Sequence, residues 1–424
     1  MGMTIIEKIL ARASGRPEVA PAEYIVAKID RIMLPGERLG GFIEGLGSWW
    51  TERKLDKVFD PEKVVVINEH EIPPFSVTTA QRYAACRMGV KKLGIQHFFD
   101  IGRGGICHQV FAEKGFALPG ELVVGGDSHT CTYGAFNTAS QGMQYDLPYV
   151  LTTGETWFRV PPTVRFLING KLPAGVFSKD VVLAIAQTYG TEIGLQKSLE
   201  FTGSTIQEMS ISARMTIANI GIELGADFAL FEADKKVIDF VKSRTNEPFE
   251  PVFSDLDAEY EAEYEIDVST LTPKVACPHH LGNVKDVTTV AGTKIDQAFL
   301  GSCTNARYDD LLIAAMILQG RKIHPDVRLI ITPASQEVYQ QALNEGLINT
   351  FLEAEALVTN ATCGACGGSQ LGILGAGEVC IGSHNRNYRG RMGSPDAEIY
   401  VASPATVVAS AIEGAIADPR KYLQ

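Results

Sequence analysis

Short apolar runs alternate with helical patterns in both the first and the last third of the chain, and this alternation restricts the fold more than any other feature. Such alternation is typical of βαβ units and of mostly parallel sheets. We therefore expect an α/β fold, with a first helix that Thr4 and Glu7 cap and that Gly15 ends. A second helix is expected over 78–93, and strands are expected over 64–67, 98–101, 122–124, 298–300, 329–332, 356–358, 379–381 and 399–401.

Two breaks divide the chain into three parts. Pro161 and Pro162 mark the first break, and residues 278–283 mark the second. The middle part contains a helical stretch, strand candidates interrupted by glycine, and an acidic patch over 255–267 that is typical of a solvated edge. We expect three α/β domains around a central cleft, formed by residues 1–162, 163–285 and 286–424.

Composition excludes several classes of protein. The 424 residues include 38 Lys and Arg against 50 Asp and Glu, so the net charge of −12 disfavours binding to a nucleic-acid backbone. The longest unbroken apolar run, 311–318, is far shorter than the roughly 20 residues that span a bilayer. Glu7 and Lys8 stand where a signal peptide requires an apolar stretch. Eight cysteines spread over a long chain indicate reduced thiols, so a cytoplasmic location is expected.

Polar or reactive side chains follow several of the expected strands. Ligands of open parallel sheets bind outside the carboxyl ends of the strands, so we expect these side chains to share one cleft. The groups are Asn68-Glu69-His70, Cys107-His108-Gln109, Asp127-Ser128-His129-Thr130, Ser302-Cys303-Thr304-Asn305, Cys363-x-x-Cys366 and Ser383-His384-Asn385-Arg386.

Three chemistries compete for the pair Cys363 and Cys366. A redox dithiol of the thioredoxin type lies at a helix N-terminus, but five glycines within 367–377 disfavour a helix there. A structural zinc site uses four ligands, usually as two pairs, and the chain has one Cys-x-x-Cys pair. An iron–sulfur cluster is the third interpretation, because Cys thiolates hold such clusters.

The number of available thiols bears on the cluster interpretation. Cys303 also follows an expected strand, whereas Cys380 falls inside one and Cys277 lies near a domain boundary. Iron–sulfur clusters usually have four Cys ligands, and no obvious fourth thiol is present. Three ligands would leave one iron open, which is the arrangement that a Lewis-acid catalyst needs.

Arginines and acid–imidazole pairs complete the inventory. Arg386, Arg389 and Arg391 lie within six residues of an otherwise acidic protein, which favours bidentate recognition of substrate carboxylates. Asp127 with His129 resembles a general acid, because a carboxylate fixes the tautomer of an imidazole and raises its pKa. Glu69 with His70, and His108, offer the same chemistry. The inventory predicts dehydration or hydration of a hydroxy polycarboxylate.

Four motifs together resemble the aconitase superfamily, and most closely its large (catalytic) subunits of the 3-isopropylmalate dehydratase and homoaconitase type. The likeness runs from about residue 4 to the C-terminus. The motifs are Gly-Asp127-Ser128-His129-Thr, Gly-Ser-Cys303-Thr-Asn, Cys363-x-x-Cys366-Gly and Asn385-Arg386-Asn387-x-x-Gly390-Arg391.

This resemblance implies a cofactor and a set of site residues. It implies a [4Fe–4S] cluster on Cys303, Cys363 and Cys366, with the fourth iron open to the hydroxyl and one carboxylate of the substrate. The implied catalytic residues are Asp127, His129, His108, Glu69, His70 and Glu223. The implied substrate-binding residues are Arg386, Arg391, Asn385, Ser128 and Asn219.

The chain departs from the family pattern at two places that bear on the substrate. Glu69-His70 stands where Asp-His is common, and Pro35-Gly36 stands where a His-Asp or Gln-Asp dipeptide is usual, so a polar contact is expected to be lost there. 3-Isopropylmalate is the default substrate of the family. A dialkylmalate such as 2,3-dimethylmalate is suggested by Pro35-Gly36, whereas homoaconitate or aconitate would need a site for a third carboxylate.

The resemblance also implies a partner. Single-chain members of the superfamily carry a further swivelling domain with a serine base, and this chain shows no segment that could supply it. We expect a large subunit of a hydro-lyase acting on a malate-type 2-hydroxy dicarboxylate, completed by a small subunit that carries the swivel domain. RNA binding by the cluster-free chain is a remote alternative, because the sequence has no basic stripe.

Overall fold

The computed structural model describes residues 2–44, 55–368 and 370–423, and the chain folds into two compact units. Unit 1 consists of Met1–Ile168, Gly194–Ile211 and Gly225–Ile266. Unit 2 consists of Asn169–Ile193, Ser212–Leu224 and Asp267–Gln424.

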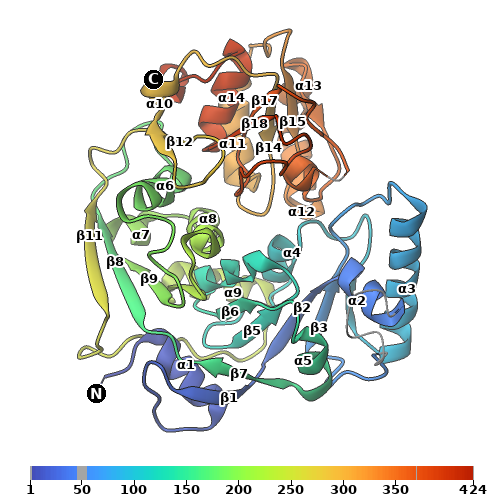
Figure 1. Cartoon of the computed structure of the whole chain (residues 1–424), viewed down its shortest axis with the longest axis vertical. Helices are drawn as coiled ribbons and strands as arrows, with labels where there is room; N and C mark the ends of the chain where they lie inside the picture. The colour runs from blue at the N-terminus through green and yellow to red at the C-terminus, as the bar shows by residue number, and fades with distance from the viewer. Residues whose placement is uncertain (1, 45–54, 369, 424) are drawn as a thin grey trace. The chain divides into compact units, whose positions relative to one another are not determined.

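A five-stranded parallel sheet forms the centre of unit 1. Because neighbouring strands all run parallel, the carboxyl ends of these strands lie at one edge of the sheet. The strand order is β4 (His97–Phe99), β3 (Val64–Ile67), β2 (Arg31–Pro35), β5 (Leu122–Gly125) and β6 (Ala139–Gly142). Helices α2 (Gly36–Glu44) and α3 (Val77–Leu93) lie side by side on the β3 side of this sheet (Figure 1).

The sequence explains where the helices of this unit begin and end. Helix α1 (Ile5–Ser14) starts with the predicted capping box between Thr4 and Glu7, and it ends where Gly15 takes a left-handed φ of 70°. The remaining helices are α4 (Cys107–Glu113), α5 (Leu147–Thr153), α7 (Ser204–Glu208), α9 (Lys235–Arg244) and the 3₁₀ helix η2 (Ser128–Phe136).

A second sheet of unit 1 comes from the middle of the chain. Its order is β10 (Phe228–Phe231), β9 (Ser198–Thr202), β8 (Thr163–Asn169) and β11 (Ala262–Asp267), and a two-stranded antiparallel sheet joins β1 (Tyr24–Lys28) to β7 (Glu155–Arg159). Phe228 and Leu230 share one apolar core with strands β2, β3 and β5. Asn137 also donates to the carbonyl oxygens of Phe231 and Val252, both at 2.9 Å. The middle sheet therefore packs as part of unit 1.

Some helices of the segment 163–285 belong to unit 2, so the structure divides this segment between the two units. These helices are α6 (Ser178–Tyr189), most of α8 (Ile211–Ile220) and the 3₁₀ helix η3 (Gly221–Leu224). The division into domains at residues 162 and 285 stays a prediction from the sequence.

A seven-stranded sheet forms the centre of unit 2. Its order is β13 (Val284–Asp286), β12 (Lys274–Ala276), β18 (Glu398–Ala402), β17 (Val379–Gly382), β14 (Gln297–Leu300), β15 (Arg328–Ile331) and β16 (Leu357–Val358). Strands β18, β17, β14, β15 and β16 run parallel to one another, and β12 runs antiparallel to both of its neighbours, β18 and β13. The other helices are α10 (Val287–Val290), α11 (Tyr308–Leu318), α12 (Gln336–Asn344), α13 (Leu347–Glu353), α14 (Pro404–Glu413), η4 (Gly364–Gly367) and η5 (Pro419–Tyr422).

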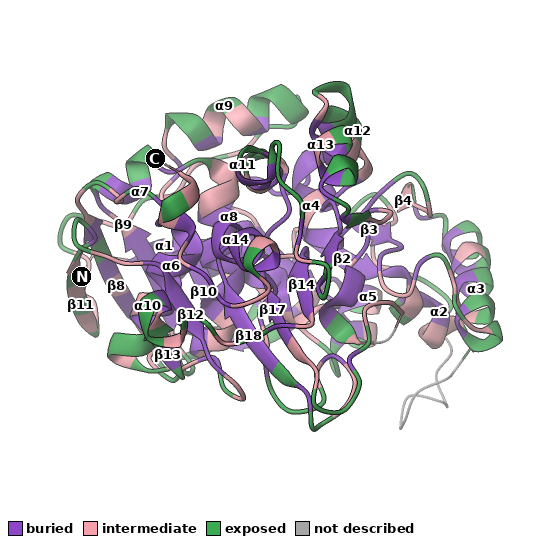
Figure 2. Cartoon of the chain, turned by 90° about the horizontal axis from the view of Figure 1, so that it is seen from above, coloured by how far each residue is buried: buried purple, intermediate pink, exposed green. Residues whose placement is uncertain are grey.

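The expected elements agree with the structure. Each predicted strand coincides with one of β3, β4, β5, β14, β15, β16, β17 or β18 to within two residues at either end. The central strands β14, β17 and β18 are largely buried, as Figure 2 shows, which is typical of parallel sheets covered on both faces. The α/β class with mostly parallel sheets is therefore confirmed. Among the described residues, none of the helices combines the length and the hydropathy that crossing a membrane requires.

Candidate active site

Asp127 connects two imidazoles at the carboxyl end of β5 in unit 1. It is the N-cap of η2, and its Oδ1 accepts from the backbone N–H of His129 at 2.8 Å. The same oxygen accepts from Nε2 of His108 at 2.9 Å, and Nδ1 of His129 lies 3.6 Å away. Ser128 Oγ lies 3.1 Å from Nδ1 of His129. The predicted residues Asp127, Ser128, His129 and His108 therefore form one cluster.

The electrostatics of this cluster keep Asp127 ionised. Burial alone would raise the pKa of Asp127, but hydrogen bonds from His108 and His129 outweigh burial and hold the pKa well below its ordinary value. An ionised carboxylate accepts and does not donate, so Nε2 of His108 carries the proton of this contact. Nδ1 of His108 then faces the hydroxyl of Tyr133 at 3.2 Å.

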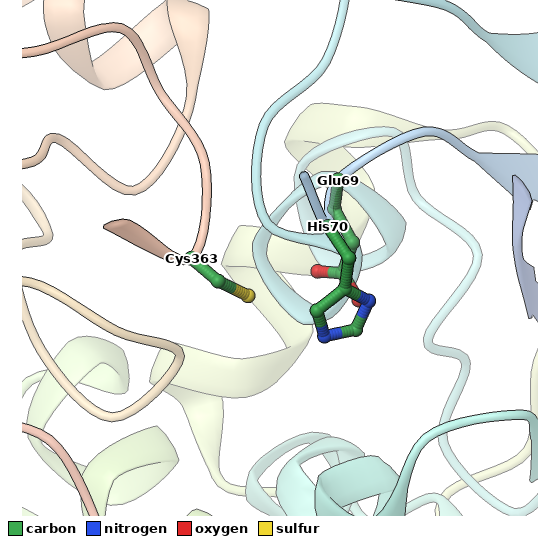
Figure 3. A group of neighbouring side chains, drawn as sticks. All are labelled: Glu69, His70 and Cys363. Atoms are coloured by element: carbon green, nitrogen blue, oxygen red, sulfur yellow. The ribbon is translucent and has the colours of Figure 1, made fainter. Parts of the chain in front are cut away.

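The second acid–imidazole pair follows β3. Glu69 is buried; its Oε2 accepts from the backbone N–H of Cys107 at 2.6 Å, and its Oε1 lies 3.3 Å from Nδ1 of His70. Figure 3 shows the two side chains next to each other in the loop after β3. Burial raises the pKa of Glu69, and the neighbouring His70 opposes this effect. The pairing expected from Glu69-His70 is therefore present.

A second carboxylate, which belongs to none of the sequence motifs, also contacts His70. Glu37, in the first turn of α2, places its Oε1 3.0 Å from Nδ1 of His70, closer than the oxygen of Glu69. Pro35-Gly36 predicts the loss of a polar contact, yet the next residue supplies a carboxylate. An acidic residue in the first turn of a helix that follows a parallel strand is the signal that could have revealed it.

Two of the predicted thiols meet in unit 2. Cys303 follows β14, and Cys366 lies on η4 after β16. Ser302 Oγ lies 3.8 Å from the sulfur of Cys303 and 3.5 Å from that of Cys366. Asn385 also contacts both sulfurs, with Nδ2 3.2 Å from Cys303 Sγ and Oδ1 3.7 Å from Cys366 Sγ.

Cys363 begins the turn that carries Cys366. Its carbonyl oxygen accepts from the backbone N–H of Cys366 at 3.3 Å, and Figure 3 shows its sulfur pointing away from the loop. Gly364 and Gly368 take left-handed φ values of 61° and 60°, so glycine suits both positions of this tight turn. The expectation that no long helix follows the Cys-x-x-Cys pair is confirmed, because η4 ends at Gly367.

The donor set of this turn fits an iron–sulfur cluster. Cys303, Cys363 and Cys366 form no disulfide, and thiolates are the usual ligands of such clusters. The two other thiols considered from the sequence, those of Cys380 and Cys277, are less suitable as cluster ligands. Burial raises the pKa of Cys380 to about 12 and also raises that of Cys277. Both lie among apolar core residues, where a thiolate is costly.

The arginine loop follows β17 in the same unit. Arg391 Nη2 donates to Cys366 Sγ at 3.2 Å, and its buried Nε has no hydrogen-bond partner among the described residues. Arg386 donates through Nε to Glu223 Oε1 of η3 at 2.6 Å. Arg389 is exposed and contacts only the carbonyl oxygen of Pro395 within the described chain. Arg391 and Arg386 therefore contact the predicted site residues Cys366 and Glu223.

Two buried cations that the sequence did not reveal support these loops. Lys179 of α6 donates to the carbonyl oxygens of Ser383 and His384 at 2.5 and 2.9 Å. Arg307 donates to the carbonyl oxygens of Cys303 and Thr304 at 2.7 and 2.6 Å. Both cations thus hold the backbone beside the predicted site residues.

The predicted residue Asn219 lies buried on α8, one turn before Glu223.

Comparison with known proteins identifies relatives over the whole length. A model of the aconitase family (aconitate hydratase) matches residues 68–292 and 279–414. The chain is 47% identical to a probable 3-isopropylmalate dehydratase large subunit of Methanothermobacter thermautotrophicus, over 99% of both chains. It is 45% identical to 3-isopropylmalate dehydratase large subunit 1 of Methanopyrus kandleri, over 100% of both. A probable methanogen homoaconitase large subunit of Methanothermobacter thermautotrophicus is 44% identical, over 99% of this chain and 98% of the relative.

Proposed function

The chain belongs to the aconitase family, and from this premise we propose that it is the large subunit of an iron–sulfur hydro-lyase that acts on 3-isopropylmalate. Membership of the family makes the chain a hydro-lyase. The substrate follows from the relatives, most of which are 3-isopropylmalate dehydratase large subunits.

Cys303, Cys363 and Cys366 would hold a [4Fe–4S] cluster with one iron free of protein ligands. When bound, such a cluster supplies a Lewis acid for the substrate hydroxyl. Arg386 and Arg391 bind the substrate carboxylates, since a guanidinium matches a carboxylate with two parallel hydrogen bonds. Asn385 orients the two sulfurs that it contacts.

The acid–imidazole pairs handle the proton that leaves with the hydroxyl. Expelling hydroxide is slow, so an imidazolium at His70 or His129 protonates the hydroxyl and water departs. A base on the small subunit takes the proton from the adjacent carbon, and the electron pair of that C–H bond forms the double bond. Addition of water in the opposite sense would complete an isomerisation.

The observation that carries this proposal is the contact between Arg391 and Cys366 at 3.2 Å. It places a carboxylate-binding group directly beside a thiol of the proposed cluster. A substrate held by Arg391 would therefore lie next to the metal that activates its hydroxyl.

The proposed partner is a small subunit, because the relatives are named large subunits. All eight cysteines lie in the described part of the chain and none forms a disulfide, which supports a reducing, cytoplasmic compartment.

The test uses the chain co-expressed with its small subunit and loaded with iron and sulfide without oxygen. The wild-type pair should show visible cluster absorbance and dehydrate 3-isopropylmalate, and the Cys363→Ser pair should lose both. Full cluster absorbance and turnover in the Cys363→Ser pair would contradict the proposal.

Two other hydroxy acids are second candidates. Homoaconitate is supported by the relative at 44% identity. 2,3-Dimethylmalate is supported by Gly36, where a Cβ would lie 1.6 Å from Asn68 Oδ1, so this position has no room for a polar side chain. Ranking kcat/KM for the three acids decides between them, and a pair that turns over only a tricarboxylate would overturn the proposed substrate.

A further inference from the structure

Glu37 belongs to none of the motifs that the family resemblance contributes, yet it contacts a proposed catalytic imidazole. Its Oε1 lies 3.0 Å from Nδ1 of His70. The side chain of Glu37 is 18% exposed, and Oε2 is buried with no hydrogen-bond partner among the described residues. A buried carboxylate oxygen without a partner is costly, so its retention calls for an explanation.

The backbone leaves few other positions for a polar group at this strand end. Pro35 ends β2 with a buried ring, and Gly36 packs against Asn68 and Cys86. A Cβ on residue 36 would lie 1.6 Å from the side-chain oxygen of Asn68. Glu37 is therefore the first residue after β2 whose side chain can reach the imidazole.

Two carboxylates converge on one ring nitrogen. Nδ1 of His70 faces Glu37 Oε1 at 3.0 Å and Glu69 Oε1 at 3.3 Å. Carboxylate oxygens accept, so Nδ1 carries a proton and Nε2 is the nitrogen that exchanges protons with a ligand. Tyr83 donates from its hydroxyl to the carbonyl oxygen of His70, which holds the backbone of this residue as well.

We propose that Glu37 is a positioning residue that fixes the His70 ring and whose negative charge makes the site select dicarboxylates over tricarboxylates. The proposal rests on the proposed function, because it assumes that His70 exchanges a proton with the substrate. A third substrate carboxylate near His70 would meet the charge of Glu37 at short range in a partly buried setting, where repulsion is strong. A dicarboxylate whose groups are held by arginines avoids that repulsion.

The experiment compares three variants of the cluster-loaded pair of subunits. Glu37→Gln keeps the shape but removes the charge, and Glu37→Asp keeps the charge on a shorter side chain. Glu71→Gln is the matched control, because Glu71 also adjoins His70 in sequence but contacts Thr79 Oγ1 instead, at 2.9 Å. Each is assayed for kcat and KM with 3-isopropylmalate and with homoaconitate.

In Glu37→Gln we expect kcat for 3-isopropylmalate to fall about tenfold with little change in KM. The ratio of kcat/KM for homoaconitate to that for 3-isopropylmalate should rise about fivefold. Glu37→Asp should keep the wild-type ratio, and Glu71→Gln should resemble the wild type in both quantities. An unchanged ratio in Glu37→Gln, or an equal change in Glu71→Gln, overturns the inference.

A second readout separates failure of this inference from failure of the proposed function. In the ¹⁵N-histidine NMR spectrum of the pair, the Nδ1 proton of His70 should shift upfield in Glu37→Gln and stay in place in Glu71→Gln. A wild-type pair that turns over none of the hydroxy acids defeats the proposed function, whereas the spectrum still decides whether Glu37 holds His70. An unshifted Nδ1 resonance in Glu37→Gln overturns the positioning role.

Discussion

Arg386 donates through Nε to Glu223 Oε1 at 2.6 Å, which ties a residue expected to bind substrate to one expected to act in catalysis. The pair lies within unit 2 and is partly buried. No other hydrogen bond of the Arg386 side chain occurs among the described residues. Its two terminal nitrogens therefore remain for a ligand, and Glu223 fixes the plane in which they point.

Replacing this arginine by lysine should weaken substrate binding more than turnover. Arg386→Lys keeps the charge but loses both the bond to Glu223 and the two parallel donors. Losing hydrogen bonds to a charged group costs about 1.5–3 kcal/mol, which corresponds to a KM for the hydroxy diacid raised roughly 10–100-fold. Steady-state kinetics of the pair of subunits measures this change. Arg389→Lys is the control, since Arg389 is exposed, and an equal rise in its KM would contradict the role of Arg386.

Asp127 should be essential to turnover because it organises two imidazoles. Asp127→Asn presents an amide to Nε2 of His108 and to the N–H of His129 in place of an acceptor-only group. Loss of a positioned acid–imidazole pair lowers kcat on the order of a hundredfold to ten-thousandfold. Cluster absorbance should stay at the wild-type level. A kcat within about threefold of the wild type would show that Asp127 and its two histidines do not act in the reaction.

The same carboxylate makes stability depend on pH in a defined direction. Burial raises the pKa of Asp127, but the histidine donors hold it well below the ordinary 3.8 in the folded state. Because the unfolded state binds more protons in the window below that value, the contribution is complete above about pH 4 and is lost as pH falls further. The difference in free energy of unfolding between the wild type and Asp127→Asn should therefore shrink below about pH 4, as urea titrations can measure. A difference that grows on acidification would be inconsistent with an ionised Asp127.

Local patterns predicted two helices of unit 1 and eight strands, namely β3, β4 and β5 of unit 1 and β14 to β18 of unit 2. The capping box of Thr4 and Glu7, and the apolar runs that became β3, β14 and β17, depend on residues close together in sequence. The allocation of the middle segment could not be predicted in this way. It depends on Phe228 and Leu230 sharing a core with strands about a hundred or more residues earlier in the chain.

The candidate site shows the same limit. The motif residues could be found because they follow strand ends, and the structure groups them as two clusters, one in each unit. Lys179 and Arg307 could not, because a lone charged residue is usually a solvated surface group. Glu37 left one signal, its position in the first turn of the helix that follows β2. Lys179 meets carbonyl oxygens 204 and 205 residues further along the chain, a contact that no local pattern encodes.

The contribution of Lys179 to the free energy of unfolding should increase with pH. Lys179 holds the start of the arginine loop that follows β17. Burial lowers its pKa to about 7, and Asp310 opposes this effect. Between about pH 7 and 10.5 the unfolded state then binds more protons, so this contribution to stability rises with pH. The slope is about 1.4 kcal/mol per pH unit at most.

Lys179→Met should consequently be more damaging at high pH. It removes both donated hydrogen bonds and leaves the carbonyl oxygen of His384 without this partner, at a cost of about 1–3 kcal/mol. The gap in melting temperature between the wild type and this variant should widen from about pH 7 to pH 9. Lys171→Met is the control, since Lys171 is exposed in the same unit. A gap that narrows with pH would exclude a buried ammonium of low pKa.

Removing the thiol of Cys380 should leave the proposed cluster intact. This thiol lies on β17 among the apolar residues around Phe299, where burial raises its pKa to about 12, and Gln297 Nε2 lies 3.9 Å from its sulfur. Cys380→Ala should cost on the order of 1 kcal/mol of stability and should preserve the cluster absorbance. Cys303→Ala should abolish that absorbance, because Cys303 is one of the three proposed ligands. Its sulfur contacts both Ser302 and Asn385 beside Cys366. Cluster loss in the Cys380 variant, at a melting temperature close to that of the wild type, would mean that the cluster has a fourth thiolate and no iron open to a hydroxy acid.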